Sequence, residues 1–301
     1  MYDIIIIGGG PAGLTAATYA RRAGKQVLVI EKNAFGGQIT WSPRVENFPG
    51  YVSISGIELG DKLLEQAMEQ GAETELEEVT ALRRENGSWT VECESGAAFE
   101  GKALILATGA KPRMLGVARE EELVGSGVCY CAVCDGAFYA GRDVAVCGGG
   151  NSALQDALLL SESCRKVTLI HRRDSFRGEQ KLVEALEKKD NVDFWLNTRV
   201  KALLGEEELS GLRLEQNGEE RELKVEGVFI AIGHQPDNAA FAEFLTLDAA
   251  GYAASGEDCR TVTPGLFVAG DCRSKSVRQL TTAAADGAVA ALAACEYLDR
   301  A

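Results

Sequence analysis

Two segments repeat the same pattern of apolar and polar positions along this 301-residue chain. Residues 4–31 read IIIIGGGPAGLTAATYARRAGKQVLVIE, and residues 144–171 read VAVCGGGNSALQDALLLSESCRKVTLIH. They align without a gap, and each predicts a buried strand, a glycine turn, a helix and a second buried strand that ends in a polar residue. This order of elements is typical of the βαβ unit that binds dinucleotides.

Other apolar runs break at glycine in a similar way and indicate how the two repeats are organised. Residues 104–112 (LILATGAKP) resemble residues 228–236 (VFIAIGHQP), and LFVAGDC precedes an alanine-rich helix. Hairpin signals around 86–99 and 208–226 predict small accessory sheets. The pattern predicts an α/β protein with two Rossmann-like dinucleotide-binding domains of the three-layer ββα type. We expect the second domain, residues 114–241, to be inserted into a discontinuous first domain, residues 1–113 and 242–301.

The charge of the chain limits its partners. The formal net charge is −14. This acidity argues against nucleic acid and anionic membranes, which attract clusters of Lys and Arg, and it fits a neutral or basic protein partner better. The opening sequence MYDIIIIGGG is too short for a membrane span and has no cationic lead. We therefore expect a cytoplasmic protein that does not enter a membrane.

Both repeats carry the glycine fingerprint of dinucleotide sites. Its positions are Gly8, Gly10 and Gly13 in the first repeat, and Gly148, Gly150 and the permitted Ala153 in the second. Small residues there allow a tight turn, a close approach of backbone to pyrophosphate, and a helix N-terminus that faces the phosphates. A glycine turn without a ligand is the alternative for each repeat. The complete βαβ context, present twice, favours two nucleotide sites.

The two repeats differ where the second strand ends. The first ends in Glu31, and a carboxylate there accepts hydrogen bonds from a ribose 2′-hydroxyl and repels a 2′-phosphate. The second ends in His171, Arg172 and Arg173, with Arg177 soon after. Arginine pairs with a 2′-phosphate, so the second site suits a phosphorylated nucleotide. The alternative for this cluster is a solvated charged face.

Three cysteines, Cys129, Cys131 and Cys134, lie within six positions in GVCYCAVCDG, just before the second repeat. Zinc usually takes four ligands in two pairs, and the segment offers at most three. A static disulfide is unusual in the cytoplasm. A dithiol that cycles is therefore favoured over both alternatives. Asp135, next to Cys134, is a candidate general acid for the leaving thiolate, with a simple Asp-Gly turn as the alternative.

With these motifs in place, the chain resembles the low-molecular-weight, bacterial-type thioredoxin reductases. The resemblance covers essentially all 301 residues and rests on GGGPAGLTAA, GGQI, VENFPG, ATGA, CAVCDG, GGGNSA, HRRDSFR, AIGHQP and VAGDC with the later RQ. It implies a homodimeric flavoenzyme that passes electrons from NADPH through FAD to a Cys131–Cys134 disulfide and on to thioredoxin. It also implies that Cys134 lies nearest the flavin, that Cys131 attacks the partner's disulfide, and that Asp135 is the acid.

The same resemblance implies two sets of cofactor-binding residues. The FAD set is Gly8, Gly10, Pro11, Ala12, Gly13, Glu31, Lys32, Ala34, Phe35, Gly36, Gly37, Gln38, Ile39, Asn47, Thr108, Gly109, Gly270, Asp271, Arg278, Gln279 and Leu280. The NADPH set is Gly148, Gly150, Asn151, Ser152, His171, Arg172, Arg173 and Arg177.

Some positions depart from the family pattern. Cys129 stands where such proteins often have serine, and we expect it to be inert; Gln155 stands where the family usually has an acidic residue. Rival interpretations are a ferredoxin-dependent thioredoxin reductase, a flavin dithiol oxidase on the same fold, and a flavin-bound sensor without turnover. The arginine cluster argues against the first two, because neither needs a 2′-phosphate site. The sensor is excluded least directly.

Overall fold

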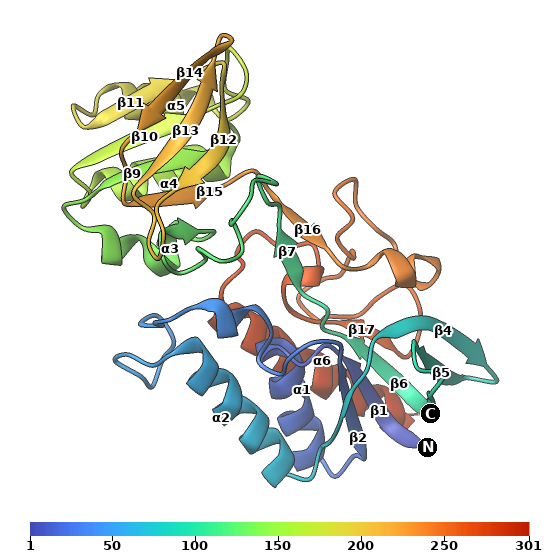
Figure 1. Cartoon of the computed structure of the whole chain (residues 1–301). Helices are drawn as coiled ribbons and strands as arrows, with labels where there is room; N and C mark the ends of the chain where they lie inside the picture. Colours follow the sequence, from blue (N-terminus) through green and yellow to red (C-terminus); the bar gives the residue numbers. More distant parts are fainter. Residues whose placement is uncertain (301) are drawn as a thin grey trace. The chain divides into compact units, whose positions relative to one another are not determined.

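The computed structural model of this protein describes residues 1–300 and divides into two units (Figure 1). The first unit comprises residues 1–111 and 235–301, and the second comprises residues 112–234. The chain passes between them through β7 (Ala110–Pro112) and β16 (His234–Pro236), which pair as a two-stranded sheet. The sequence placed the corresponding boundaries at 113 and 242.

The first unit is built on a seven-stranded sheet in the order β3-β2-β1-β6-β5-β4, with β17 also paired to β6. Its strands are β1 (Tyr2–Ile7), β2 (Val27–Glu31), β3 (Glu73–Leu76), β4 (Val79–Glu85), β5 (Ser88–Cys93), β6 (Ala98–Leu106) and β17 (Leu266–Val268). The pairs among β3, β2, β1, β6 and β17 are parallel, and β4, β5 and β6 form an antiparallel meander. Strand β6 therefore belongs to two layers, as Gly101 pairs with both Trp89 and Tyr2.

Helices cover one face of the parallel part of this sheet, and the β4–β5–β6 meander covers its other face. The helical elements are α1 (Pro11–Arg22), η1 (Gly37–Trp41), α2 (Gly56–Glu69), η3 (Ala239–Phe244), η4 (Gly270–Cys272) and α6 (Leu280–Arg300). Ile4 and Ile6 pack with the helical residues, whereas Ile5 and Ile7 pack in a second cluster with Trp89. Because successive strand residues point to opposite faces, a strand buried on both sides must be apolar throughout, which explains the run of four isoleucines.

The second unit repeats this layering on a smaller sheet. Its five parallel strands run in the order β11-β10-β9-β15-β8, and a separate meander runs β12-β13-β14. The bounds are β8 (Val128–Cys129), β9 (Asp143–Cys147), β10 (Lys166–Ile170), β11 (Val192–Trp195), β12 (Thr198–Leu204), β13 (Gly211–Gln216), β14 (Glu219–Leu223) and β15 (Gly227–Ile230). Its helical elements are α3 (Ala132–Asp135), η2 (Gly136–Tyr139), α4 (Asn151–Ser161) and α5 (Gln180–Glu187).

Alternation along β9 again separates two cores. Val144 and Val146 pack with the helices, and Ala145 and Cys147 pack with residues of the meander such as Leu212. The expected α/β class, with helix, sheet and meander layers in each unit, is confirmed. Within residues 1–300, no helix is both long and apolar enough to cross a membrane.

Candidate functional site

The residues expected to bind FAD gather at one edge of the first unit's sheet. Glu31 is the last residue of β2, and Gly8, Thr108 and Gly270 follow within two residues of the ends of β1, β6 and β17; these four strands are neighbours and parallel. Because the carboxyl ends of parallel strands meet at one edge, the topology brings together segments up to 262 positions apart. Ligands of open α/β sheets bind at this edge.

Some glycines of the first turn are packed tightly against backbone atoms, whereas Gly10 has open space around its Cα. Gly8 has a φ of +111°, and a Cβ on Gly13 would lie 1.9 Å from the carbonyl oxygen of Gly8. A Cβ on Gly10 would meet only backbone atoms at 3.9 Å. The Gly36 N–H donates to the carbonyl oxygen of Gly9 at 2.8 Å, which ties the 34–39 loop to the turn. The arrangement leaves space for a pyrophosphate at Gly10 and at the N-terminus of α1.

The Glu31 carboxylate is oriented by backbone N–H groups of the first glycine turn and of the loop after β2. Its Oε2 accepts a hydrogen bond from the Gly9 N–H at 2.7 Å, and its Oε1 accepts one from the Asn33 N–H at 3.0 Å. Each carboxylate oxygen keeps a lone pair, as a ribose diol would require. Lys32 is placed differently, because its Nζ lies 2.5 Å from an Asp237 carboxylate oxygen.

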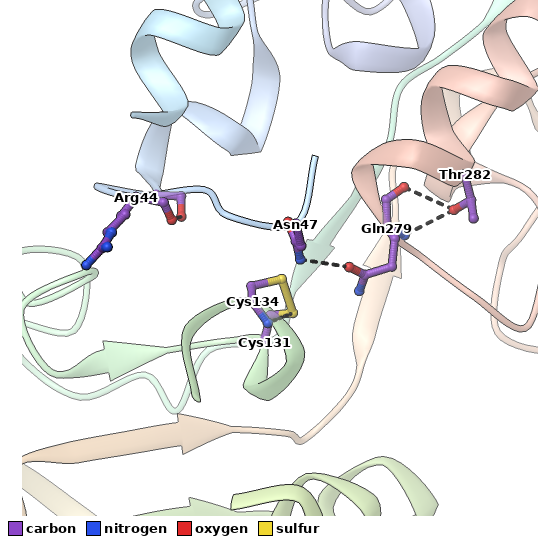
Figure 2. Close-up of a disulfide and its surroundings, with 7 residues drawn as sticks. Arg44, Asn47, Cys131, Cys134, Gln279 and Thr282 are labelled. Atoms are coloured by element: carbon purple, nitrogen blue, oxygen red, sulfur yellow. Dashed lines mark hydrogen bonds between the residues drawn. A yellow bond between two sulfur atoms is a disulfide. The ribbon is translucent and has the colours of Figure 1, made fainter. Parts of the chain in front are cut away.

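The remaining expected FAD residues surround the same edge. Gln38 donates from Nε2 to the carbonyl oxygen of Ala110 at 2.5 Å. Asn47 donates from Nδ2 to Oε1 of Gln279 at 3.4 Å, and the backbone of Gln279 exchanges hydrogen bonds with the Thr282 hydroxyl (Figure 2). Ile39 and Leu280 pack against one small apolar cluster. The structure thus joins the 34–47 segment to the start of α6.

Asp271 carries an unsatisfied acceptor. Its Oδ1 is buried and has no hydrogen-bond partner among residues 1–300, and burial raises the pKa of its carboxyl group. A buried polar atom without a partner is costly unless a ligand satisfies it. Arg278 lies 4.0 Å from the Tyr252 ring centroid and beside the Asp271 backbone. A hydroxyl group of the sugar-alcohol chain of FAD would donate the missing hydrogen bond to Asp271. Together with the open glycine turn and the Glu31 carboxylate, this acceptor fits FAD.

The second glycine turn has the same construction. A Cβ on Gly148 would lie 2.4 Å from the carbonyl oxygen of Ala231, whereas a Cβ on Gly150 would meet nothing within 4 Å. The Arg177 N–H donates to the carbonyl oxygen of Gly149 at 2.7 Å. Asn151 adds a second tie, because its Oδ1 accepts from the Glu179 N–H at 2.7 Å. These bonds hold the arginine-bearing loop beside the open turn.

The basic residues of this loop divide into two kinds. Arg172, Arg173 and Arg177 are exposed, as is Ser152 at the start of α4. His171 is buried, and a Cβ on Gly149 would lie 2.2 Å from its ring. Burial and the neighbouring Arg177 lower the pKa of His171, so its imidazole is neutral at pH 7. The His171 ring packs against Gly149 and so supports the glycine turn. The exposed arginines are the side chains that are able to bind a 2′-phosphate.

The cysteine pair lies at the carboxyl edge of the second unit's sheet, after its edge strand β8. Cys131 and Cys134 form a disulfide (Figure 2). Cys131 is the N-cap of α3, and the Cys134 N–H donates to its Sγ at 3.2 Å. This donor would stabilise a Cys131 thiolate once the disulfide opened. The dithiol therefore shares one sheet edge with the Gly148 turn and the arginine loop, which follow β9 and β10.

Asp135 ends α3 and is half-buried. Burial raises the pKa of its carboxyl group from 3.8 to about 6, so it holds a proton over much of the acidic range. Gly136 after it has helical backbone angles and begins η2, so Asp135 lies at the junction of two helical elements and not in the simple Asp-Gly turn that was the alternative. A carboxylic acid with this pKa can donate a proton near neutral pH.

Cys129 is set apart from its two neighbours. It is buried in β8, its Sγ donates to the Tyr139 hydroxyl at 3.4 Å, and burial raises its pKa to about 12. The thiolate is the reactive form, so this thiol has little reactivity. All seven cysteines outside the disulfide are buried, as expected for packed residues.

One structural residue near the dithiol carries no sequence signal. Glu120 is buried, and its carboxylate accepts hydrogen bonds from the N–H groups of Leu115 and Gly116 at 2.8 and 2.9 Å. It also accepts one from the Tyr130 hydroxyl at 3.0 Å, one residue before Cys131. In the sequence it is one acid in the run REEEL, and nothing local distinguishes it from its exposed neighbours Glu121 and Glu122.

Comparisons with known proteins agree on one family. Residues 2–287 match the model of the pyridine nucleotide-disulphide oxidoreductases. The chain is 43% identical to a thioredoxin reductase of Listeria monocytogenes, covering 99% of this chain and 94% of the relative. It is 41% identical to one of Treponema pallidum, covering 99% and 97%. The crystal structure of a Streptococcus pyogenes thioredoxin reductase superposes with a TM-score of 0.95 at 40% identity, covering 100% of this chain and 99% of the other.

Proposed function

This chain belongs to the pyridine nucleotide-disulphide oxidoreductase family, and we propose that within it the protein is an NADPH-dependent, FAD-containing thioredoxin reductase. The resemblance inferred from the sequence is confirmed by these comparisons. The observation that carries the proposal is the Cys131–Cys134 disulfide at the sheet edge that also bears an arginine-flanked dinucleotide turn. Residues 1–113 and 242–301 would form the FAD domain, and residues 114–241 the NADPH domain.

The cofactors supply the two-electron chemistry, because flavin accepts hydride from a nicotinamide and can pass an electron pair to a disulfide. The protein supplies binding and orientation. The turn at Gly8 to Gly13, Glu31 and Asp271 would hold FAD. The turn at Gly148 to Ser152 would hold the NADPH pyrophosphate, and Arg172, Arg173 and Arg177 its 2′-phosphate. His171 would act by supporting that turn.

The cysteines would transfer the electron pair by exchange. The Cys131 thiolate attacks one sulfur of the thioredoxin disulfide, which forms a mixed disulfide and releases one thioredoxin thiolate. The Cys134 thiolate then attacks the Cys131 sulfur, which reforms the Cys131–Cys134 disulfide and releases the second thiolate. Thioredoxin gains two electrons, and two protons complete its dithiol. The bond from the Cys134 N–H to the Cys131 sulfur supports Cys131 as the first nucleophile.

Asp135 would supply a proton to a departing thiolate. It immediately follows Cys134 in the chain and is half-buried. Burial raises its pKa to about 6, so a larger fraction of this carboxyl group carries a proton near neutral pH than in an exposed aspartate. We further propose that the protein acts in the cytoplasm as a homodimer.

One set of experiments tests this proposal. The purified protein is expected to show a flavin spectrum that bleaches anaerobically with NADPH and recovers when oxidised thioredoxin is added. NADH is expected to bleach it much less efficiently, because it lacks the phosphate that the arginines would bind. A preparation that binds no flavin after FAD is added would refute the proposal. Equal use of NADH would refute the role given to the arginines.

Two cysteine variants test the dithiol relay. Cys134→Ser is expected to abolish thioredoxin reduction while the flavin still bleaches with NADPH, because only the exchange step is lost. Cys129→Ser is the matched control, since Cys129 is buried and lies outside the relay; it is expected to reduce thioredoxin at the wild-type rate. Thioredoxin reduction by Cys134→Ser would count against the relay.

A further inference from the structure

We propose that Asp286, on α6, is a positioning residue that holds the flavin-binding residues around Gly270 and Ala12 in place. The inference rests on the proposed function, because it concerns the shape of the FAD site. In the sequence, nothing distinguishes Asp286, which is one polar residue in an alanine-rich helix. The residue is 7% exposed, and its carboxylate contacts the segment that begins at Gly270.

Four donors converge on the Asp286 carboxylate. Its Oδ2 accepts from the Gly270 N–H at 3.0 Å, from Nε of Arg273 at 2.8 Å and from Nζ of Lys275 at 2.8 Å. Its Oδ1 accepts from Nη2 of Arg273 at 2.9 Å. All four come from the single segment 270–275, which contains η4. One carboxylate on α6 therefore fixes the backbone position of this segment.

The segment fixed in this way carries the open acceptor of the site. Asp271 lies between Gly270 and Cys272 in η4, and its unsatisfied Oδ1 is the group that fits a cofactor hydroxyl. Gly270 has a φ of +78°, a conformation that glycine adopts without strain but as one of many that are open to it. The hydrogen bond from its N–H to Asp286 holds it in that one conformation. Displacement of Gly270 would move the Asp271 oxygen away from its ligand.

The residue after Asp286 contacts the other half of the site. A Cβ on Gly287 would lie 2.1 Å from the carbonyl oxygen of Ala12, so α6 and α1 touch backbone to backbone there. A Cβ on Gly270 would in turn lie 2.9 Å from the Cβ of Ala12. The pair Asp286–Gly287 is thus in contact with both the helix that would bind the pyrophosphate and the segment that would bind the sugar-alcohol chain.

The buried charges are better explained by positioning than by stability. Arg273 and Lys275 have side chains that are 5% and 8% exposed, and Asp286 is their shared partner. Burying such charges is expensive, and well-packed apolar residues often serve stability equally well. A carboxylate that accepts four directed hydrogen bonds, in contrast, selects one geometry for the segment.

The variant Asp286→Asn keeps the shape of the side chain and removes this geometry. The amide offers one acceptor oxygen in place of two, and its NH₂ group faces donors that it cannot satisfy. We expect the dissociation constant for FAD, measured by titrating the flavin-free protein, to rise at least about tenfold, which is about 1.4 kcal/mol. We also expect a less structured visible spectrum of the bound flavin. Affinity for NADPH is expected to stay unchanged.

Glu296→Gln is the matched control, because Glu296 is an exposed acid on the same helix that pairs with Arg260, away from Gly270 and Asp271. It is expected to bind FAD with wild-type affinity. If Asp286→Asn does not fold, Arg273→Lys tests the same inference, since it keeps a buried cation and loses the two-bond contact; it is also expected to weaken FAD binding.

Three results separate the possible failures. A wild-type protein that binds no FAD would remove the proposed function itself. A wild-type protein that binds FAD, together with variants that bind it equally well, would overturn the role of Asp286 alone. A lower melting temperature of the flavin-free variant with an unchanged FAD dissociation constant would make Asp286 a structural residue, and would also overturn the inference.

Discussion

At the scale of single residues, burial decides which carboxyl groups and thiols can react. Asp135 and Asp156 are both half-buried acids of the second unit, and burial raises the pKa of each to about 6. Cys129 has a pKa raised to about 12 by the same cause. Only Asp135 lies next to the disulfide in the chain. The same physical effect thus makes one carboxyl group useful for proton transfer and makes one thiol inert.

The acid role of Asp135 predicts a specific pH dependence. Asp135→Asn is expected to slow the reduction of thioredoxin about 100-fold, within the usual range for loss of a general acid. In the wild-type protein this step is expected to slow as the pH rises through about 6, because the proton-donating form is lost. The variant should lose this dependence. A pH–rate profile under single-turnover conditions measures both, and a variant with the wild-type profile would contradict the assignment.

The raised pKa of Asp156 predicts an effect on the stability of the fold and not on catalysis. Its pKa is higher in the folded chain, so between pH 4 and 6 the folded chain keeps a proton that the unfolded chain has lost, and the free energy of unfolding falls as the pH rises. The rise to about 6 corresponds to at most about 3 kcal/mol, and partial solvation reduces it. We expect Asp156→Asn to raise the free energy of unfolding by about 1–2 kcal/mol at pH 7 and by little at pH 4.

Urea unfolding of the wild type and the variant at the two pH values measures this difference. Asp190→Asn is the control, because Asp190 is an exposed acid of the same unit, and it is expected to change stability little at either pH. A gain in stability for Asp156→Asn that is equal at pH 4 and pH 7 would show that the charge of Asp156 is not its cause.

At the scale of elements, each glycine turn contains glycines that the fold requires and glycines that it does not require. Gly13 and Gly148 are needed by the fold, because a Cβ on either would overlap a backbone carbonyl oxygen. Gly10 and Gly150 face open space or ordinary contacts, so the fold does not require glycine there. Where the fold would accept a side chain, the presence of glycine is explained by a ligand that approaches the backbone closely.

This difference predicts opposite results for two variants. Gly150→Ala is expected to fold with wild-type stability and to bind NADPH at least about tenfold more weakly, because the methyl group occupies the phosphate cradle. Gly148→Ala is expected to lower the melting temperature by several degrees, because its φ of +158° and the 2.4 Å approach to Ala231 force a backbone shift. Calorimetry of both variants and NADPH titration of Gly150→Ala measure these effects. Unchanged NADPH affinity in Gly150→Ala would place the nucleotide elsewhere.

At the scale of the whole molecule, the second unit is an insertion whose two ends lie together. The chain leaves the first unit at β7 and returns at β16, and these strands pair. Paired strands are about 4.8 Å apart, so a short linker can replace everything between them. Every residue of the FAD set belongs to the first unit. The first unit would therefore contain the whole proposed FAD site by itself.

This organisation predicts that the first unit can fold and bind FAD without the second unit. A chain in which Lys111 is joined to Gln235 by a short glycine–serine linker is expected to fold and to bind FAD, but not to be reduced by NADPH. Flavin absorbance and NADPH titration measure the two properties. The Asp271→Asn form of the shortened chain is the control, and it is expected to bind FAD more weakly. A shortened chain that folds without binding FAD would show that the second unit completes the site.

The sequence by itself determined the repeated βαβ units, the three layers, the cysteine pair and the family. The motifs that carry these features are local, because a strand, a glycine turn and a CxxC each depend on residues within about thirty positions. The apolar runs also predicted the strands themselves, and the structure explains why they lack alternation: helices cover one face and a meander the other.

Only the tertiary structure decided the features that depend on distant segments. The burial that raises the pKa of Asp135, the placement of His171 beneath Gly149, the bonds of Glu120 and the four donors at Asp286 all depend on packing between separate elements. In the sequence, Glu120 is one of several adjacent acids and Asp286 is a polar residue in a helix of alanines. A charge acquires its pKa and its role from the groups that fold against it, and composition and spacing do not specify these groups.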